Sequence, residues 1–203
     1  MSVARSRPIL RADARVNREK LLGAAANLFA TVGVDVSLEA VAKQAGVGIG
    51  TLYRHFPTRD ALIEAVYRQE VDRLCGAADE LRSSSAPDVA LEAWMRRFVA
   101  YAATKRGMAS ALQSITASNS ELYASTRARL LSAITVLLAA AVEAGTVRAD
   151  MEPEDVLQAM SGVWLIPAGE QWTARAQRLL QLLMDGLRFG APTHRPDSAS
   201  PAT

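Results

Sequence analysis

The amino-acid sequence predicts an all-α fold, in which an N-terminal three-helix domain with a helix-turn-helix precedes a larger C-terminal helical bundle, about nine helices in total. Two observations lead to this prediction. Apolar residues recur at spacings of three and four along most of the chain, and no segment alternates apolar and polar residues as a strand does. Residues 37–62 encode two short helices joined by a glycine-containing turn, which is the organisation of a helix-turn-helix.

The first helix is expected from about Arg15 to Val32, with an apolar stripe along one side and Gly33 at its end. Residues 1–14, with three arginines around Pro8, are expected to form a basic flexible arm. Such an arm either follows DNA into a minor groove or is a solvated tail, and the sequence leaves both interpretations open.

The two short helices have recognisable ends. Ser37 can cap the first by accepting a hydrogen bond from a free backbone N–H group, and Gly48 is the expected N-cap of the second. The second helix runs from about Ile49 to Phe56. At 100° per residue, Leu52 lies on the same side as both of these residues, so this side is expected to anchor the helix on a core.

The opposite side of the second helix carries small, hydroxyl-bearing and basic residues. Thr51 and Tyr53 can donate hydrogen bonds to phosphates, and Arg54 can contact phosphate or a guanine edge. For Tyr53 or Arg54 alone, a solvated surface side chain is the simpler interpretation, but the whole string favours DNA binding. The predicted DNA contacts are Ser37, Gly48, Ile49, Gly50, Thr51, Tyr53, Arg54, His55 and Arg59.

This string resembles the DNA-binding domain of TetR-family transcriptional regulators over about 60 of the 203 residues. The matching residues are Phe29, Gly33, Ser37, Val41, Ala42, Ala45, Gly46, Val47, Gly50, Thr51, Leu52, Tyr53, His55, Phe56, Arg59 and Leu62. The resemblance implies a ligand-responsive regulator, usually a repressor released from a palindromic DNA operator by a small effector. The family commonly has Ser where this chain has Gly48, and often a polar residue where it has Ile49. Ile49 is expected either to contact a thymine methyl group or to pack.

Composition agrees with a DNA-binding protein of the cytoplasm. Residues 1–60 carry nine Lys and Arg against five Asp and Glu, although the whole chain has a net charge of only +2. An excess of positive charge at this end suits phosphate binding. The single Cys fits a reducing compartment, and the chain shows no signal-peptide pattern and no run of 18 apolar residues, so no membrane partner is expected.

The DNA-binding domain is predicted at residues 15–58 and a ligand-binding and dimerisation domain at 59–189. Thr58 is expected to cap a long helix that reaches about residue 81 and forms the only continuous link between the two domains. Further helices are expected at about 88–104, 121–144, 153–166 and 173–189, with a less regular stretch at 105–119 and a disordered tail at 190–203.

A group of bulky apolar side chains in the larger domain is the candidate effector site. Aromatic and sulphur-containing residues line ligand cavities well, although for each residue alone an ordinary core position is the simpler interpretation. The family resemblance favours the cavity and a mainly apolar effector. The candidate ligand-binding residues are Trp94, Phe98, Tyr101, Met108, Leu112 and Trp164.

A homodimer is expected, because two helix-turn-helix units on a two-fold axis match a palindromic operator. The expected interface is formed by the last two helices, through Val156, Met160, Val163, Leu179, Leu182, Leu183 and Leu187. Two other functions compete with a ligand-responsive regulator: a constitutive DNA-binding protein and a helical-bundle enzyme. No catalytic constellation, metal-ligand spacing or cofactor-binding glycine loop is recognisable, so neither catalysis nor a metal or cofactor is expected.

Overall fold

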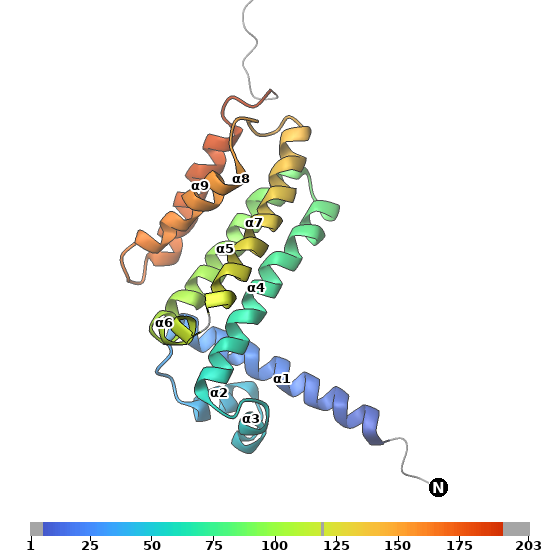
Figure 1. Cartoon of the computed structure of the whole chain (residues 1–203), viewed down its shortest axis with the longest axis vertical. Coiled ribbons are helices and arrows are strands. Elements are labelled where there is room, and N and C mark those ends of the chain that lie inside the picture. Colours follow the sequence, from blue (N-terminus) through green and yellow to red (C-terminus); the bar gives the residue numbers. More distant parts are fainter. Residues whose placement is uncertain (1–5, 119, 193–203) are drawn as a thin grey trace, which may run out of the picture. The chain divides into compact units, whose positions relative to one another are not determined.

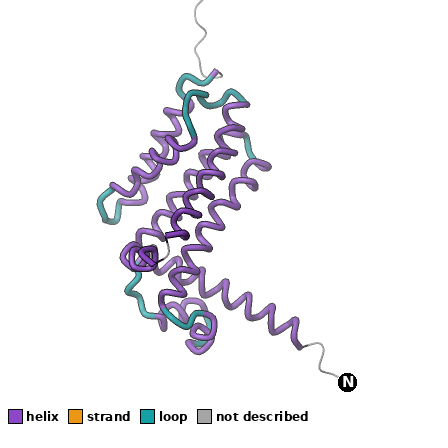
Figure 2. Tube along the Cα trace, viewed as in Figure 1, coloured by secondary structure: helices purple, strands orange, loops and turns teal. Residues whose placement is uncertain are grey.

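The computed structural model describes residues 6–118 and 120–192, and in this part of the chain it contains helices and loops but no strand (Figures 1 and 2). This confirms the all-α prediction. The elements are α1 (Ser6–Thr31), α2 (Leu38–Ala45), α3 (Ile49–His55), α4 (Arg59–Ser84), α5 (Pro87–Gly107), α6 (Ala109–Ser118), α7 (Ser120–Glu143), α8 (Pro153–Met160), the 3-10 helix η1 (Ser161–Leu165) and α9 (Trp172–Arg188).

The predicted helix caps are present. The backbone N–H of Ala40 donates to Ser37 Oγ over 3.1 Å at the start of α2, and the N–H of Ala61 donates to Thr58 Oγ1 over 3.1 Å at the start of α4. Gly46 follows α2 with φ 68°, a left-handed conformation that glycine adopts without steric cost. These local signals therefore fix the ends of the helix-turn-helix.

Three boundaries differ from the predictions. Helix α1 begins at Ser6, so residues 6–14 of the expected flexible arm are helical, because Pro8 is tolerated in a first turn where no N–H is needed. The stretch 105–119, expected to be irregular, contains the end of α5 and all of α6. Helix α8 ends at Met160 and continues as η1, close to Gly162, a residue that weakens an α-helix. Residues 1–5 of the arm and 193–203 of the tail lie outside the described residues.

The first of two compact units contains α1–α3, α4 as far as Glu70, and residues 103–120. It thus extends beyond the expected boundary at residue 58. Gly107, in the last turn of α5, has its backbone against the carbonyl oxygen of Phe29 in α1, so closely that a Cβ atom at position 107 would overlap that oxygen. The ammonium group of Lys105 lies 5.9 Å from the centre of the Tyr67 ring of α4. The end of α5 is therefore part of the core that supports the helix-turn-helix.

The second unit contains residues 71–102 and the chain after Glu121. Trp94 of α5 donates its indole N–H to the carbonyl oxygen of Leu74 in α4 over 2.8 Å, in a fully buried position. The backbone N–H of Arg148 donates to the carbonyl oxygen of Leu187 over 2.8 Å, which fixes the loop before α8 to the end of α9. Hydrogen bonds of this kind satisfy polar groups that would otherwise be buried without partners.

One helix among the described residues, Glu121–Glu143 in α7, is long and apolar enough by length and composition alone to cross a membrane. Its residues Leu130, Ile134, Leu137 and Ala141 are buried within the protein. They recur at spacings of three and four, which is the pattern of a helix with one face in a protein core. Packing thus accounts for one apolar face of α7.

Gly107→Ala is expected to lower the free energy of unfolding by about 1–3 kcal/mol, because the added methyl group must push α5 away from α1. The matched control is Gly76→Ala in the exposed middle of α4, where no atom lies within 4 Å of the new Cβ. That change should raise the free energy of unfolding by about 0.4–1 kcal/mol. Urea denaturation measures both, and equal effects would contradict the close contact between α5 and α1.

Candidate nucleic-acid interface

The helix α3 is held in the first unit by two buried side chains. Leu52 and Phe56 are almost completely inaccessible to solvent. The guanidinium group of Arg18, from α1, lies 5.4 Å from the centre of the Phe56 ring. A helix of seven residues is not stable alone in water, so these contacts fix both its presence and its orientation.

The opposite side of α3 faces outward, as the sequence predicted. Tyr53 is 47% exposed, and Gly50 and Arg54 are also exposed. Ile49, expected on the same side as Leu52, is 37% exposed. Ile49 is therefore not buried beside Leu52. It is the first residue of a short helix, and the core that covers Leu52 does not extend to this end of α3. Its exposure keeps contact with a thymine methyl group open.

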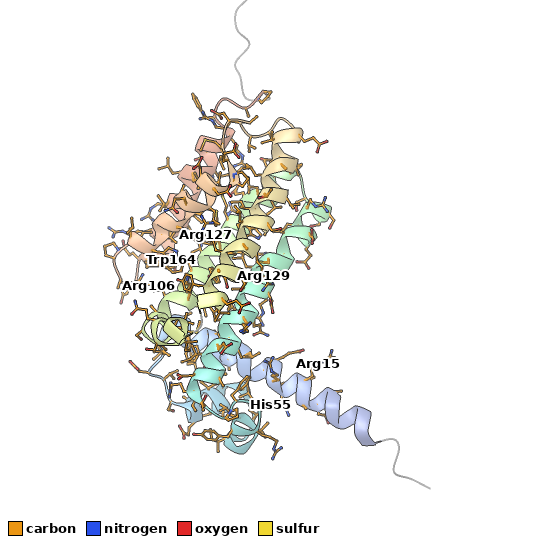
Figure 3. The ribbon with its side chains drawn as sticks, viewed as in Figure 1. Arg15, His55, Arg106, Arg127, Arg129 and Trp164 are labelled. Carbon is orange, nitrogen blue, oxygen red and sulfur yellow. The ribbon has the colours of Figure 1, made fainter. Side chains whose placement is uncertain are left out.

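The remaining predicted contacts flank this surface. Ser37 and Gly48 are exposed, and Gly48 starts α3 without a side-chain cap. Thr51 and His55 are half-buried, and His55 lies at the end of α3 (Figure 3). All these residues belong to the two short helices or their turns, so the structure brings them together on one part of the first unit.

Arg59 has a contact that the sequence did not reveal. Its Nη1 atom donates hydrogen bonds to the carbonyl oxygens of Val34 and Val36, over 2.6 and 2.8 Å. The half-buried guanidinium group thereby ties the first residue of α4 to the loop before α2. The prediction that Arg59 contacts a DNA phosphate remains untested. Because Nη1 already donates to these two carbonyl oxygens, only the other N–H groups of the guanidinium could make that contact.

Basic residues of α1 add positive charge to the same unit. Arg15, labelled in Figure 3, is exposed, and its Nε atom lies 4.0 Å from a carboxylate oxygen of Glu19, one turn further along α1. An exposed pair at this distance contributes little, so Arg15 is available to other anions. Of the basic residues in 1–60 whose side chains the structure describes, all except the half-buried Arg59 are exposed: Arg15, Arg18, Lys20, Lys43 and Arg54.

The six candidate effector residues are only partly brought together. Trp94, Phe98 and Tyr101 form a buried row on α5, with ring centroids 6.4 Å apart for the first pair and 5.7 Å for the second. Met108 and Leu112 belong to the first unit instead. Trp164 lies in η1 and is half-buried (Figure 3). The aromatic row is as closely packed as a protein core.

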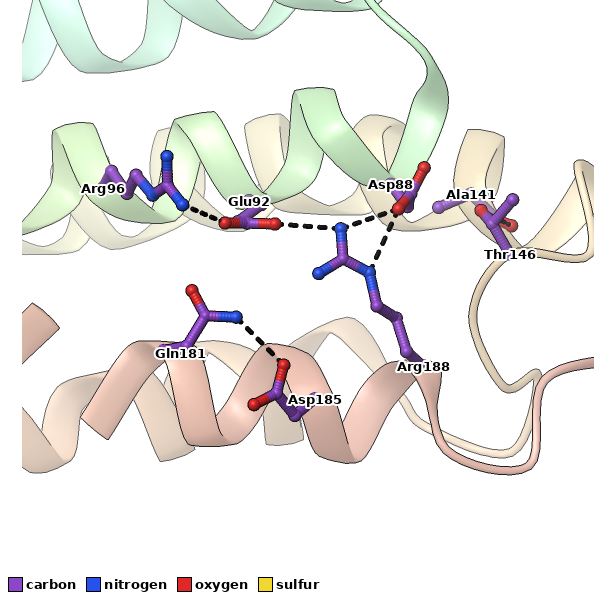
Figure 4. Close-up of polar contacts among 8 residues, drawn as sticks. All are labelled: Asp88, Glu92, Arg96, Ala141, Thr146, Gln181, Asp185 and Arg188. Atoms are coloured by element: carbon purple, nitrogen blue, oxygen red, sulfur yellow. Dashed lines mark hydrogen bonds and ion pairs between the residues drawn. The ribbon is translucent and has the colours of Figure 1, made fainter. Parts of the chain in front are cut away.

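Sequence reasoning missed a groove of about 510 Å³ between α5 and α9 in the second unit, here called the α5–α9 groove. Its lining residues are Glu92, Met95, Arg96, Val99, Ala174, Gln177, Arg178, Leu180 and Gln181. The polar lining residues lie on two separate helices, and on each helix they recur at helical spacing. A sequence shows the same pattern for the solvent-exposed face of any surface helix. Only the packing of α9 beside α5 joins them (Figure 4).

Cys75 is half-buried on α4 in a smaller hollow that it shares with Arg129 of α7. Burial raises the pKa of the Cys75 thiol, while the nearby Arg129 lowers it and Asp72 raises it. The net rise keeps the thiol protonated and therefore poorly nucleophilic. This favours the interpretation of Cys75 as a small apolar side chain.

An exposed recognition helix on a buried anchor, in a basic helical unit attached to a larger helical unit, defines a helix-turn-helix DNA-binding protein. Residues 21–66 match the model of the bacterial regulatory proteins of the tetR family. Residues 86–189 match the model of the SbtR-like transcriptional regulator C-terminal domain. The chain belongs to the TetR family of transcriptional regulators.

Solved structures agree with this assignment. The chain is similar to the TetR transcriptional regulator SCO0520 from Streptomyces coelicolor, with 47% identity, 84% of this chain and 98% of that chain covered, and a TM-score of 0.77. A TetR regulatory protein from Mycobacterium vanbaalenii has 36% identity, covers 88% of this chain and 99% of its own, and gives a TM-score of 0.72. A third structure, described as the molecular basis for control of antibiotic production by bacterial hormones, has 25% identity and a TM-score of 0.64, with 84% and 97% covered.

Curated relatives match over a shorter region. An HTH-type transcriptional regulator of Staphylococcus aureus is 39% identical over 64 residues, which is 31% of this chain and 35% of the relative. The match thus spans about a third of the length of these curated relatives. DNA binding is the property that the shared region supports.

Tyr53→Phe is expected to weaken binding to all DNA sequences, because an exposed tyrosine hydroxyl group can donate a hydrogen bond to a phosphate. Arg54→Ala is expected to lower operator affinity by about 1–3 kcal/mol and, where Arg54 contacts guanine, to relax specificity at one base pair. Fluorescence anisotropy with operator and random duplexes measures both effects. The control is Tyr123→Phe, the same change in an exposed tyrosine of α7. Wild-type affinity in both helix-α3 variants would show that another surface contacts the DNA.

Proposed function

We propose that this TetR-family protein is a cytoplasmic repressor that is released from a palindromic operator by a small, mainly apolar effector. The observation that supports this most is that the chain has, in addition to the helix-turn-helix unit, a second helical unit with an aromatic row and a groove of ligand size. A structural relative connected with control by bacterial hormones supports a small-molecule signal.

A constitutive DNA-binding protein is the second candidate function. It is favoured by the tight burial of Trp94, Phe98 and Tyr101, since a solid aromatic core needs no ligand. The two functions differ in one measurable respect, which is whether any small molecule changes operator affinity. Footprinting on the promoter beside the gene, with and without aromatic and medium-chain carboxylic acids, distinguishes them. Protection that no compound alters would favour the constitutive protein.

The proposed switch uses two continuous helices. The sequence suggested that α4 alone joins the two parts of the chain, but α5 also has residues in both compact units, with its last turn at Gly107 packed on α1. A shift of either helix would alter the recognition helices of a dimer, which must lie about 34 Å apart to fit one DNA turn. An effector that prefers the misaligned state by about 3 kcal/mol would lower operator affinity about 150-fold.

The proposed dimer uses the outer side of α9. Four of the expected interface residues are unavailable, because Val156, Met160, Val163 and Leu187 are buried within a single chain. Apolar periodicity cannot distinguish a face that packs within the chain from one that packs against a second copy. Leu182 remains, at 68% exposed, with Leu179 and Leu183 half-buried beside it.

Leu182→Glu is expected to convert the dimer to a monomer at micromolar concentration, since a charge would be buried at the centre of the interface. Sedimentation velocity measures the change. Val32→Glu is the matched control, because Val32 is also 68% exposed but follows α1 in the other unit. A wild-type protein that sediments as a monomer would rule out the dimer.

Phe98→Leu is expected to keep operator binding but reduce effector-induced release, because it removes an aromatic ring while largely preserving the buried volume. Phe98→Ala should be more severe, with a loss of about 3–5 kcal/mol of stability from the cavity it leaves. Operator release and thermal unfolding are measured on the same samples. An unchanged effector response in a folded Phe98→Leu protein would show that the aromatic row serves only as core.

A further inference from the structure

The α5–α9 groove combines an apolar floor with polar walls. Met95 and Val99 of α5 and Leu180 of α9 are its apolar members, and each is almost completely buried. The exposed side chains of Arg96 and Arg178 form part of the walls. A hollow of about 510 Å³ lies within the range of sites that hold small organic molecules.

The acidic groups at one end of the groove already have partners (Figure 4). Glu92 accepts a hydrogen bond from Arg96 and lies 2.9 Å from the guanidinium group of Arg188. Asp88 accepts hydrogen bonds from Arg188 over 2.7 and 3.0 Å. Asp185, outside the lining, accepts a hydrogen bond from the Gln181 amide over 2.9 Å. These contacts leave no unpaired carboxylate to attract a cation.

Arg178 differs from the other basic residues near the groove. Within residues 12–115 and 121–192 no carboxylate lies in ion-pair distance of it, so the lining holds one guanidinium group more than it holds carboxylates. Arg96 shares its partner Glu92 with Arg188 and can turn toward a bound anion without leaving that carboxylate unpaired. A guanidinium group presents parallel N–H donors that match a carboxylate or sulfonate.

The groove and the proposed dimer surface lie on different sides of α9. At 100° per residue, Ala174, Arg178 and Gln181 cluster on one flank, whose centre is about 125° from the centre of the side that carries Leu179, Leu182 and Leu183. Arg178 itself lies one turn before Leu182 and only about 40° from it around the helix. Leu180 and Met184 form the buried side of α9. When two copies associate through Leu182, Ala174 and Gln181 are therefore expected to lie outside the interface, with Arg178 at its edge.

We propose that the α5–α9 groove binds a small amphipathic anion, with its acidic group at Arg178 and Arg96 and its apolar body over Met95, Val99 and Leu180. The proposal rests on the proposed function for its role in regulation, since this ligand would be the effector, but its binding chemistry is independent of DNA. An apolar body with one acidic group matches both the floor and the single excess charge of the lining.

Binding is tested on the full chain without DNA, with 1-anilinonaphthalene-8-sulfonate as the anionic probe and N-phenyl-1-naphthylamine as its uncharged analogue. Fluorescence titration should give one anionic probe per protomer, at least tenfold tighter than the analogue. Arg178→Gln should weaken the anionic probe at least tenfold and leave the analogue unchanged. Arg175→Gln, which removes the same charge from a residue of α9 outside the groove, should change affinity less than twofold.

A second variant fills the groove from an exposed position. Ala174→Trp should abolish binding of both probes without disturbing the core, because Ala174 faces solvent in the free protein. Equal affinity for the charged and uncharged probes, or unchanged binding in both Arg178→Gln and Ala174→Trp, would overturn the proposal. Decanoate should displace the anionic probe competitively, and failure to do so would also count against the site.

Failure of the proposed function would be seen in a different measurement. If decanoate binds in an Arg178-dependent manner but no compound releases the operator, the groove is a binding site and the proposal of an effector-controlled repressor is wrong. If operator release occurs and is unchanged in Arg178→Gln, the function stands and the groove is wrong.

Discussion

The burial of Leu52 and Phe56 is the constraint on which DNA binding by this protein depends. A seven-residue helix has too few internal hydrogen bonds to persist alone, so α3 exists because these two side chains enter the core of the first unit. Arg18 covers the Phe56 ring from α1, and Arg59 holds the loop before α2 through two backbone carbonyls. The exposed face with Tyr53 and Arg54 is oriented by contacts on the opposite face.

Three parts of helix α5 make different contacts. One carries the buried aromatic row, where Trp94 is fixed by its hydrogen bond to α4. The adjoining flank, with Met95 and Val99, forms the floor of the α5–α9 groove. Its last turn, at Gly107, lies against the end of α1. A ligand that contacts the flank of α5 would thus touch a helix whose last turn belongs to the first unit.

The local features of the fold were predictable from the sequence because they depend on neighbouring residues. Ser37 and Thr58 cap α2 and α4 as expected, and the outward face of α3 carries Tyr53 and Arg54. The errors concern long-range packing. Val156, Met160, Val163 and Leu187 carry the same apolar signal as an interface, although they are buried within one chain. Helix α6 was missed because its short apolar pattern is weak by itself and depends on the core around it.

The sequence alone determined that this protein is an all-helical regulator of the TetR family with a helix-turn-helix, since caps, turn glycines and periodicity are local properties of the chain. Only the tertiary structure decided which apolar faces meet within one chain, that Gly107 of α5 lies against α1, that Arg59 binds a loop, and that polar residues of α5 and α9 enclose one groove. These features join residues that are many positions apart, and helical periodicity specifies which side of a helix is apolar without specifying what that side will contact.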